Sequence, residues 1–303
     1  MARIRGILAP VLTPFTEDLA PDASRLLEHC RWLLERGAGL AVFGTNSEAN
    51  SLTVQERLDL LAYLVDSGID TARMMPGTGC CAFPDTVTLS VAAVKAGCAG
   101  VLMLPPFYYK GVSDDALFRF FSETIQRVGD AALRVYLYHI PPVSQVPLSF
   151  PLIERLLKAY PGTIAGIKDS SSDWKNTEGL LCEFQSESFD VFSGSESFLL
   201  QVLSKGGAGS ITAMANVCPA AIVDLYHNWQ APEAAQKQKD LTIVREVFAK
   251  VHMISSMKAA IARARKHPAW ATPRPPLMPA PEAVMSEAFA QLEKLKFNGL
   301  DGV

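Results

Sequence analysis

The residue best placed for covalent chemistry is Lys168, which follows a run of mostly apolar residues at 163–167. Such a run predicts a buried strand. A charged lysine is costly to bury, and desolvation lowers the pKa of an amine toward the neutral, nucleophilic form. We therefore predict that Lys168 forms a Schiff base with a carbonyl substrate. On this stretch alone the alternative is a lysine that leaves the sheet and reaches into water, because most lysines are exposed.

Three hydroxyl side chains, those of Thr45, Tyr109 and Tyr138, lie at or just after other apolar runs. An amine that attacks a ketone gives a carbinolamine and then an iminium, which withdraws electrons from the neighbouring carbon–carbon bond. Each step moves protons, so a phenol close to the lysine can shuttle them. If the substrate is a 2-oxo acid, the Thr45 hydroxyl and the N–H groups of its loop can bind the carboxylate.

The chain that must position these residues alternates short apolar runs with longer amphipathic segments. Strands are expected at 6–15, 40–45, 73–77, 100–105, 133–140, 163–168, 189–193 and 210–215. Helices are expected at 22–36, 53–67, 84–96, 113–128 and 149–160, with a capping box from Thr53 to Glu56 and Asp173 as the cap of a further helix.

Eight strand–helix units predict an α/β fold, a closed (β/α)₈ TIM barrel with additional C-terminal helices. An open doubly wound sheet is the competitor, but no GxGxxG motif follows the first strand. We assign residues 1–228 to the barrel and residues 229–303 to a helical extension packed on it. Residues 268–281 are rich in proline and predict a loop. In such barrels the active site lies at the carboxyl ends of the strands, where Lys168, Thr45, Tyr109 and Tyr138 fall.

Composition narrows the class of protein. The net charge is −3, and no basic block or long apolar segment suggests nucleic-acid or membrane binding. The N-terminus lacks a secretion signal, and the six scattered cysteines suit a reduced, cytoplasmic protein. The five histidines show no metal-binding spacing, so no metal is expected.

Several segments, most of them at these strand ends, resemble segments of one enzyme family. Residues 44–48 (GTNSE) look like the GTTGE-type loop of the dihydrodipicolinate synthase / N-acetylneuraminate lyase family. Residues 138–141 (YHIP) are similar to its YNxP segment, and residues 167–170 (IKDS) to its Schiff-base lysine segment. Residues 193–194 and 206–216 follow its pattern, and residues 274–277 (RPPL) resemble a C-terminal family segment.

The resemblance implies a class I aldolase or lyase that acts on pyruvate or a related 2-oxo acid and needs no cofactor beyond the lysine imine. It implies Lys168 as the Schiff-base former, Tyr138 as the proton shuttle, and Thr45 and Tyr109 as a relay. It also implies a homotetramer, a dimer of dimers in which Tyr109 reaches into the neighbouring subunit's site. Gly194 and Ile211 are expected to line the site through backbone groups.

Two departures from the family bear on the substrate. Synthases that condense pyruvate with aspartate semialdehyde carry an arginine where this chain has Val143, and valine cannot hold the partner's carboxylate. Asn46 can still donate through its amide, whereas Ser47 alters the turn, and Glu48 is expected to hydrogen-bond loop backbone. A lyase or dehydratase for a 4-hydroxy-2-oxoglutarate or 2-keto-3-deoxy-sugar-acid substrate is therefore favoured. Dihydrodipicolinate synthase and a non-catalytic 2-oxo-acid-binding protein remain the alternatives.

Overall fold

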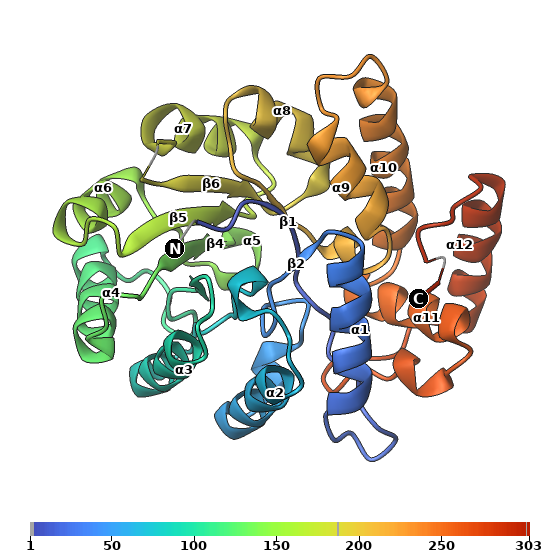
Figure 1. The fold of residues 1–303 in the computed structure, drawn as a ribbon, viewed down its shortest axis with the longest axis horizontal. Coiled ribbons are helices and arrows are strands. Elements are labelled where there is room, and N and C mark those ends of the chain that lie inside the picture. Colours follow the sequence, from blue (N-terminus) through green and yellow to red (C-terminus); the bar gives the residue numbers. More distant parts are fainter. Residues whose placement is uncertain (1–2, 187, 301) are drawn as a thin grey trace.

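The computed structural model describes residues 3–186, 188–300 and 302–303. Its strands are β1 (Gly6–Ala9), β2 (Gly39–Leu40), β3 (Val101–Met103), β4 (Val135–His139), β5 (Ile164–Asp169), β6 (Asp190–Ser193) and β7 (Gly209–Ile211). All pairings between them are parallel, in the order β2-β1-β7-β6-β5-β4-β3. The strands lie in the middle of the molecule with helices around them (Figure 1). The predicted α/β class with a parallel sheet is confirmed.

The prediction of eight strands is wrong, because the segment at 73–77 forms only isolated bridges, one to β2 and one to β3. The segment still contacts both edges of the sheet. The Gly77 N–H donates to the Val42 carbonyl over 2.7 Å, and the Leu102 N–H donates to the Pro76 carbonyl over 2.8 Å. Pro76 has no N–H, so the segment lacks one donor on the β3 side, which works against a regular ladder. Seven strands in the described residues are therefore joined edge to edge by this segment.

Three strands, β1, β2 and β7, end at least four residues earlier than predicted, each for a local reason. β1 stops before Pro10, which has no N–H to donate. β2 is followed by Phe43, whose φ of 61° leaves the extended region. β7 stops at Ile211, and the predicted end of that strand is instead the 3₁₀ helix Ala213–Asn216.

The buried side chain of Asn216 holds the 3₁₀ helix against the tail of β1. Its amide nitrogen donates to the carbonyls of Pro10 (3.1 Å) and Ala213 (3.0 Å), and its oxygen accepts the Leu12 N–H at 3.0 Å. The His29 Nε2 lies 3.2 Å from the same oxygen. Burial lowers the pKa of His29 to about 3, so its imidazole is neutral. Asn216 thus joins the first and last strands of the ring.

The helices are α1 (Ala23–Glu35), α2 (Val54–Asp66), α3 (Phe83–Lys95), α4 (Asp114–Val128), α5 (Pro141–Ser144), α6 (Phe150–Ala159), α7 (Trp174–Phe184), α8 (Leu199–Ser204), α9 (Pro219–His227), α10 (Ala234–Ala249), α11 (Met253–Arg265) and α12 (Glu282–Lys294). Two predicted caps are confirmed. Thr53 and Glu56 form a reciprocal capping box at the start of α2, and the Asp173 carboxylate accepts the Lys175 N–H at the start of α7.

The last helices, α10 to α12, lie together beside α1 (Figure 1). Their buried residues Phe248, Met257 and Leu292 belong to the same apolar cluster as Phe15, which follows β1. The predicted loop at 268–281 is confirmed except at its start, where the 3₁₀ helix Pro268–Ala271 forms. The division of the chain after residue 228 stays a prediction. No helix in the described residues is long and apolar enough to cross a membrane.

Candidate active site

Lys168 lies one residue before the end of β5, and its residue is only 3% exposed. Its strand neighbours are Tyr138 in β4 and Phe192 in β6. The Lys168 Nζ lies 4.2 Å from the centre of the Tyr138 ring and borders a cavity. Within the described part of the chain, this amine has neither a salt bridge nor a hydrogen bond. Lys168 therefore presents an unpaired amine to the cavity at the carboxyl end of the sheet.

Tyr138 places its hydroxyl next to that of Thr45, with 3.2 Å between the two oxygens. Tyr138 is 4% exposed, so its phenol has little access to bulk water. The two residues come from positions 93 apart in the chain, one at the end of β4 and one in the loop after β2. The predicted grouping of the lysine, the phenol and the threonine hydroxyl is thus present in one place.

The loop that carries Thr45 has an unusual backbone. Phe43 before it and Glu48 after it have left-handed φ angles of 61° and 55°. Each such non-glycine residue costs about 1–2 kcal/mol, so other contacts must hold the loop in this shape. The consecutive N–H groups of Thr45 and Asn46 have no hydrogen-bond partner among the described residues. Successive free N–H groups form an anion-binding concavity, as a 2-oxo-acid carboxylate requires.

Ser47, which stands where the resembling loops have glycine, is built into this turn. Its hydroxyl accepts the Gly44 N–H at 3.2 Å, and its carbonyl accepts the Thr13 hydroxyl at 2.7 Å. The residue is 1% exposed. Ser47 therefore ties the turn to itself and to the segment after β1, and the following residue, Glu48, takes the left-handed conformation.

The cavity beside Lys168 measures about 250 Å³. Six of the residues predicted from the sequence line it: Thr45, Asn46, Tyr138, Val143, Lys168 and Gly194. Val143 is 62% exposed. Because valine is uncharged, the side chain in the position of the family's arginine offers no charge to a ligand. This volume is close to that of known small-molecule sites.

Two predicted residues do not line the cavity. Tyr109 is 72% exposed and packs edge-to-face on Tyr108, with 5.3 Å between the ring centres. Ile211 has no exposed surface and belongs to the apolar cluster inside the ring, together with Tyr138. The structure does not bring Tyr109 to Lys168 within one chain, and the roles of both residues stay predictions.

The cavity also contains a cation that sequence reasoning missed. Arg245 of α10 lines it, and its Nη1 lies 3.1 and 3.3 Å from the two carboxylate oxygens of Glu196. Glu196 is fully buried and also accepts the Thr212 hydroxyl. The Nε and Nη2 of Arg245 have no partner among the described residues. The sequence of α10 does not distinguish Arg245 from its other charged residues, because the position of Arg245 in the cavity depends on how the C-terminal helices pack over the strand ends.

His139 and Asp169, which follow Tyr138 and Lys168 in the sequence, hydrogen-bond to nearby parts of the fold. Burial lowers the pKa of His139, which the charge of Asp169 partly opposes, and the His139 Nδ1 accepts the Leu148 N–H at 3.0 Å. Asp169 accepts from the Ser171 N–H at 3.0 Å and from the Thr177 hydroxyl at 2.6 Å. Within the described residues, no cluster of three or more histidine, cysteine or acidic side chains could hold a metal ion.

Residues 3–295 match a sequence model of the dihydrodipicolinate synthetase family. An "uncharacterized DapA-like lyase" of Chloroflexus aurantiacus is 33% identical over 300 residues, which cover 97% of this chain and 98% of that protein. The crystal structure of dihydrodipicolinate synthase from Agrobacterium tumefaciens has a TM-score of 0.88 at 28% identity and covers 96% of this chain and 99% of its own. That of YagE, a prophage protein of the same family from E. coli K12 in complex with pyruvate, also has a TM-score of 0.88, at 26% identity, and covers 97% and 99%. The chain therefore belongs to the dihydrodipicolinate synthetase family.

Proposed function

We propose that the protein is a lyase that forms a Schiff base between Lys168 and pyruvate or a related 2-oxo acid. One observation carries the proposal: the buried, unpaired Lys168 amine lies 4.2 Å from the ring of Tyr138, whose hydroxyl is 3.2 Å from that of Thr45. A nucleophile and a hydroxyl relay thus share one cavity. Family membership supports the same reading, as does the pyruvate complex of YagE.

The first half of the reaction binds the substrate covalently. The free N–H groups of Thr45 and Asn46 hold the carboxylate while the Lys168 amine attacks the C2 carbonyl. The amine nitrogen gives one proton to the carbonyl oxygen, which yields a carbinolamine. A second proton, delivered to the carbinolamine hydroxyl, lets water leave, and an iminium remains. Tyr138 is the group that carries these protons, because its phenol lies beside the amine and is linked to the Thr45 hydroxyl.

The second half breaks or forms a carbon–carbon bond. For a 4-hydroxy-2-oxo acid, removal of the proton from the C4 hydroxyl releases an aldehyde. The electrons of the C3–C4 bond move into the iminium and give an enamine. Protonation of C3 restores the iminium, and water then frees the 2-oxo acid and the lysine. The protein's residues supply the amine, the proton relay and the carboxylate site, so no cofactor is needed.

The cavity favours a substrate with a polar or acidic far end. Arg245 and Lys168 are the cations that line it in the described residues, and Arg245 keeps two nitrogens free of partners. A 4-hydroxy-2-oxoglutarate or 2-keto-3-deoxy-sugar-acid type of substrate suits this arrangement. Dihydrodipicolinate synthase activity is the weaker candidate, because Val143 stands where the resembling synthases carry their arginine.

The proposal is tested by incubating the protein with a panel of 2-oxo acids and borohydride, then locating any adduct by mass spectrometry. We expect a reduced adduct on Lys168 and none in the Lys168→Ala variant. Binding without an adduct, retained in Lys168→Ala, would instead identify a non-catalytic 2-oxo-acid-binding protein. Turnover of pyruvate with aspartate semialdehyde would overturn our interpretation of Val143.

We also propose a homotetrameric, cytoplasmic enzyme in which Tyr109 of one subunit completes the relay of another. The exposure of Tyr109, 72%, supports this, since an aromatic side chain of this kind suits an interface. We further propose that the fold is a closed (β/α)₈ barrel in which the segment at 73–77 stands between β2 and β3 as the eighth strand. Light scattering gives the mass of the assembly, and Tyr109→Phe tests the relay.

A further inference from the structure

A fully buried ion pair lies directly behind the carboxylate-binding loop. Lys258 of α11 pairs with Glu48, and neither side chain has any exposed surface. The Lys258 Nζ also donates to the Thr272 carbonyl over 3.0 Å and lies 4.4 Å from the centre of the Phe15 ring. Buried ion pairs of this kind are weak contributors to stability, because desolvation offsets their attraction. Their best attested use is to select one local arrangement of the chain.

Glu48 is the last residue of the loop at 44–48 and the one with the left-handed φ of 55°. Its second carboxylate oxygen accepts the Arg274 N–H at 2.8 Å. Its own N–H donates to the Thr45 carbonyl over 3.1 Å. A contact path therefore runs from Lys258 through Glu48 to the backbone of Thr45, and through the Thr45 hydroxyl to Tyr138. Part of the expectation for Glu48 is confirmed, since it does hydrogen-bond backbone, although that backbone belongs to the C-terminal segment.

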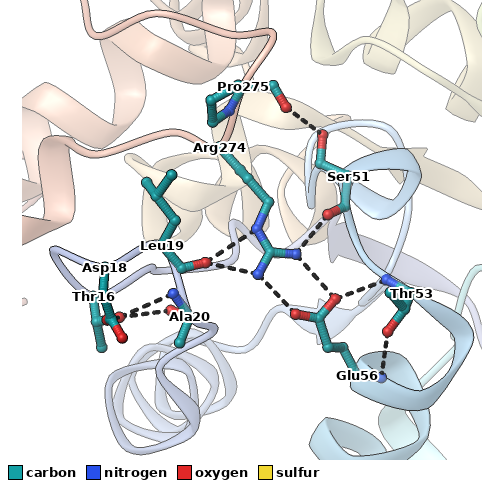
Figure 2. Close-up of polar contacts among 9 residues, drawn as sticks. All are labelled: Thr16, Asp18, Leu19, Ala20, Ser51, Thr53, Glu56, Arg274 and Pro275. Atoms are coloured by element: carbon teal, nitrogen blue, oxygen red, sulfur yellow. Dashed lines mark hydrogen bonds and ion pairs between the residues drawn. The ribbon is translucent and has the colours of Figure 1, made fainter.

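A second ion pair, between Arg274 and Glu56, lies nearby, and among the described residues its side chains form no hydrogen bond with the loop at 44–48. The Arg274 guanidinium binds both oxygens of Glu56, at 2.7 and 2.9 Å, together with the carbonyls of Leu19 and Ser51 (Figure 2). These contacts hold the start of α2 and the turn after β1. The pair thus offers a matched control, because Arg274 can lose its side chain and keep the N–H that binds Glu48.

We propose that Lys258 is a positioning residue: its ion pair with Glu48 holds the loop at 44–48 so that Thr45 meets Tyr138 and the loop's free N–H groups face the 2-oxo-acid carboxylate. This inference rests on the function proposed above. It gives the C-terminal helices a part in the reaction, because α11 supplies a residue that shapes the site without touching the substrate. It also explains how a strained loop without the family's glycine keeps one conformation.

The test uses pyruvate as the probe and borohydride to trap the adduct. Two quantities are measured for each of four proteins: the half-saturating pyruvate concentration and the midpoint of thermal unfolding. These are the wild type, Lys258→Met, the double variant Glu48→Gln/Lys258→Met, and Arg274→Met. In Lys258→Met we expect a lower midpoint and a half-saturating concentration raised about tenfold, which corresponds to about 1.4 kcal/mol. The double variant leaves no unpaired buried charge, so its midpoint should recover while its half-saturating concentration stays raised.

Arg274→Met should lower the midpoint and leave the half-saturating concentration near that of the wild type. A merely structural role for Lys258 predicts the opposite pattern. The double variant would then bind pyruvate like the wild type, or Arg274→Met would weaken binding as much as Lys258→Met does, and either result overturns the proposal. If Lys258→Met does not fold, the double variant decides. A wild type that forms no adduct with any 2-oxo acid overturns the proposed function itself, so the two failures are distinct.

Discussion

The hydroxyl oxygens of Tyr138 and Thr45 lie 3.2 Å apart, and the Lys168 amine lies over the ring of the same tyrosine. The Tyr138 side chain thus contacts Thr45 through its hydroxyl oxygen and Lys168 through the face of its ring. In the reaction proposed above, this arrangement would place a proton carrier beside the amine that forms the imine.

Removing the Thr45 hydroxyl should slow turnover more than it weakens binding. Thr45→Val keeps the shape of the side chain and the backbone N–H groups, but it leaves the Tyr138 hydroxyl without its partner. We expect kcat to fall at least roughly tenfold, the cost of one lost hydrogen bond in the transition state. Thr45→Ser, which keeps the hydroxyl, is the control. Equal losses in both variants, in steady-state assays, would contradict a relay through Thr45.

A methyl group at Gly194 should disrupt the cavity wall. A Cβ there would lie 2.0 Å from the Ser170 hydroxyl oxygen and 2.9 Å from the Asp169 carbonyl, and the backbone N–H of Gly194 already donates to that carbonyl over 2.6 Å. We expect Gly194→Ala to lose about 1–3 kcal/mol of stability through overpacking and to form less adduct at a given pyruvate concentration. Denaturant unfolding and borohydride trapping measure the two effects. A variant with wild-type values in both would show that the loop has room to move.

Arg245 should decide between short and long 2-oxo acids. Arg245→Met removes the second cation that lines the cavity, so kcat/KM for a substrate with a distal carboxylate should fall at least roughly tenfold. Pyruvate has no such group, and its half-saturating concentration should not change. Arg245→Lys, which keeps the charge, should lie in between. Equal losses for both classes of acid would place Arg245 in the scaffold alone.

Acid should weaken the contact between α2 and the C-terminal segment. Hydrogen bonds from Arg274, opposed by partial burial, lower the pKa of Glu56 to about 2 from 4.5. The pair's contribution is complete above pH 4.5 and is lost as the pH falls toward 2. The side chains are 19% and 26% exposed, and screening by solvent limits the effect to below about 1 kcal/mol. Glu56→Gln should flatten this part of the stability curve in urea titrations, and an unchanged slope would contradict the assignment.

Alkaline pH should raise the free energy of unfolding through Lys258. Burial lowers the pKa of Lys258 to about 8, against the attraction of Glu48 and together with repulsion from Arg25 and Arg274. Between pH 8 and 10.5 the unfolded chain holds a proton that the folded chain has released, so this group makes the free energy of unfolding rise with pH. The rise is at most about 3 kcal/mol.

Other groups titrate in the same window, so the quantity to measure is the difference between the wild type and Glu48→Gln/Lys258→Met. We expect that difference to increase with pH from 8 to 10.5. A flat difference would show that Lys258 keeps its proton throughout.

The sequence predicts most of this scaffold because local signals specify it. Thr53 and Asp173 cap helices as expected, and Lys168 lies in the last two residues of a strand, close to where its apolar run predicts the strand end. The failures are also local in origin. Pro76 removes a donor from a segment that otherwise reads as a strand, and Phe43 adopts a left-handed conformation that no propensity marks.

The candidate site divides in the same way. Thr45, Tyr138 and Lys168 follow from strand ends, because parallel strands bring their carboxyl ends to one edge. Arg245 and Lys258 do not, because their contacts depend on how α10 and α11 pack against Glu196 and Glu48, which lie 49 and 210 positions earlier in the chain. The pattern of apolar residues within a helix does not indicate which distant residue a charged side chain will contact.

The ion pair of Glu48 with Lys258 also bears on the order in which the site can form during synthesis. Every residue of the relay has left the ribosome long before α11 emerges, since Lys168 precedes Lys258 by 90 positions. Until then Glu48 has no cation to pair with, and its carboxylate stays in water while the strands assemble. If the proposals above hold, a nascent chain carries the Lys168 amine before the loop at 44–48 is held in place, and the last quarter of the protein completes the site.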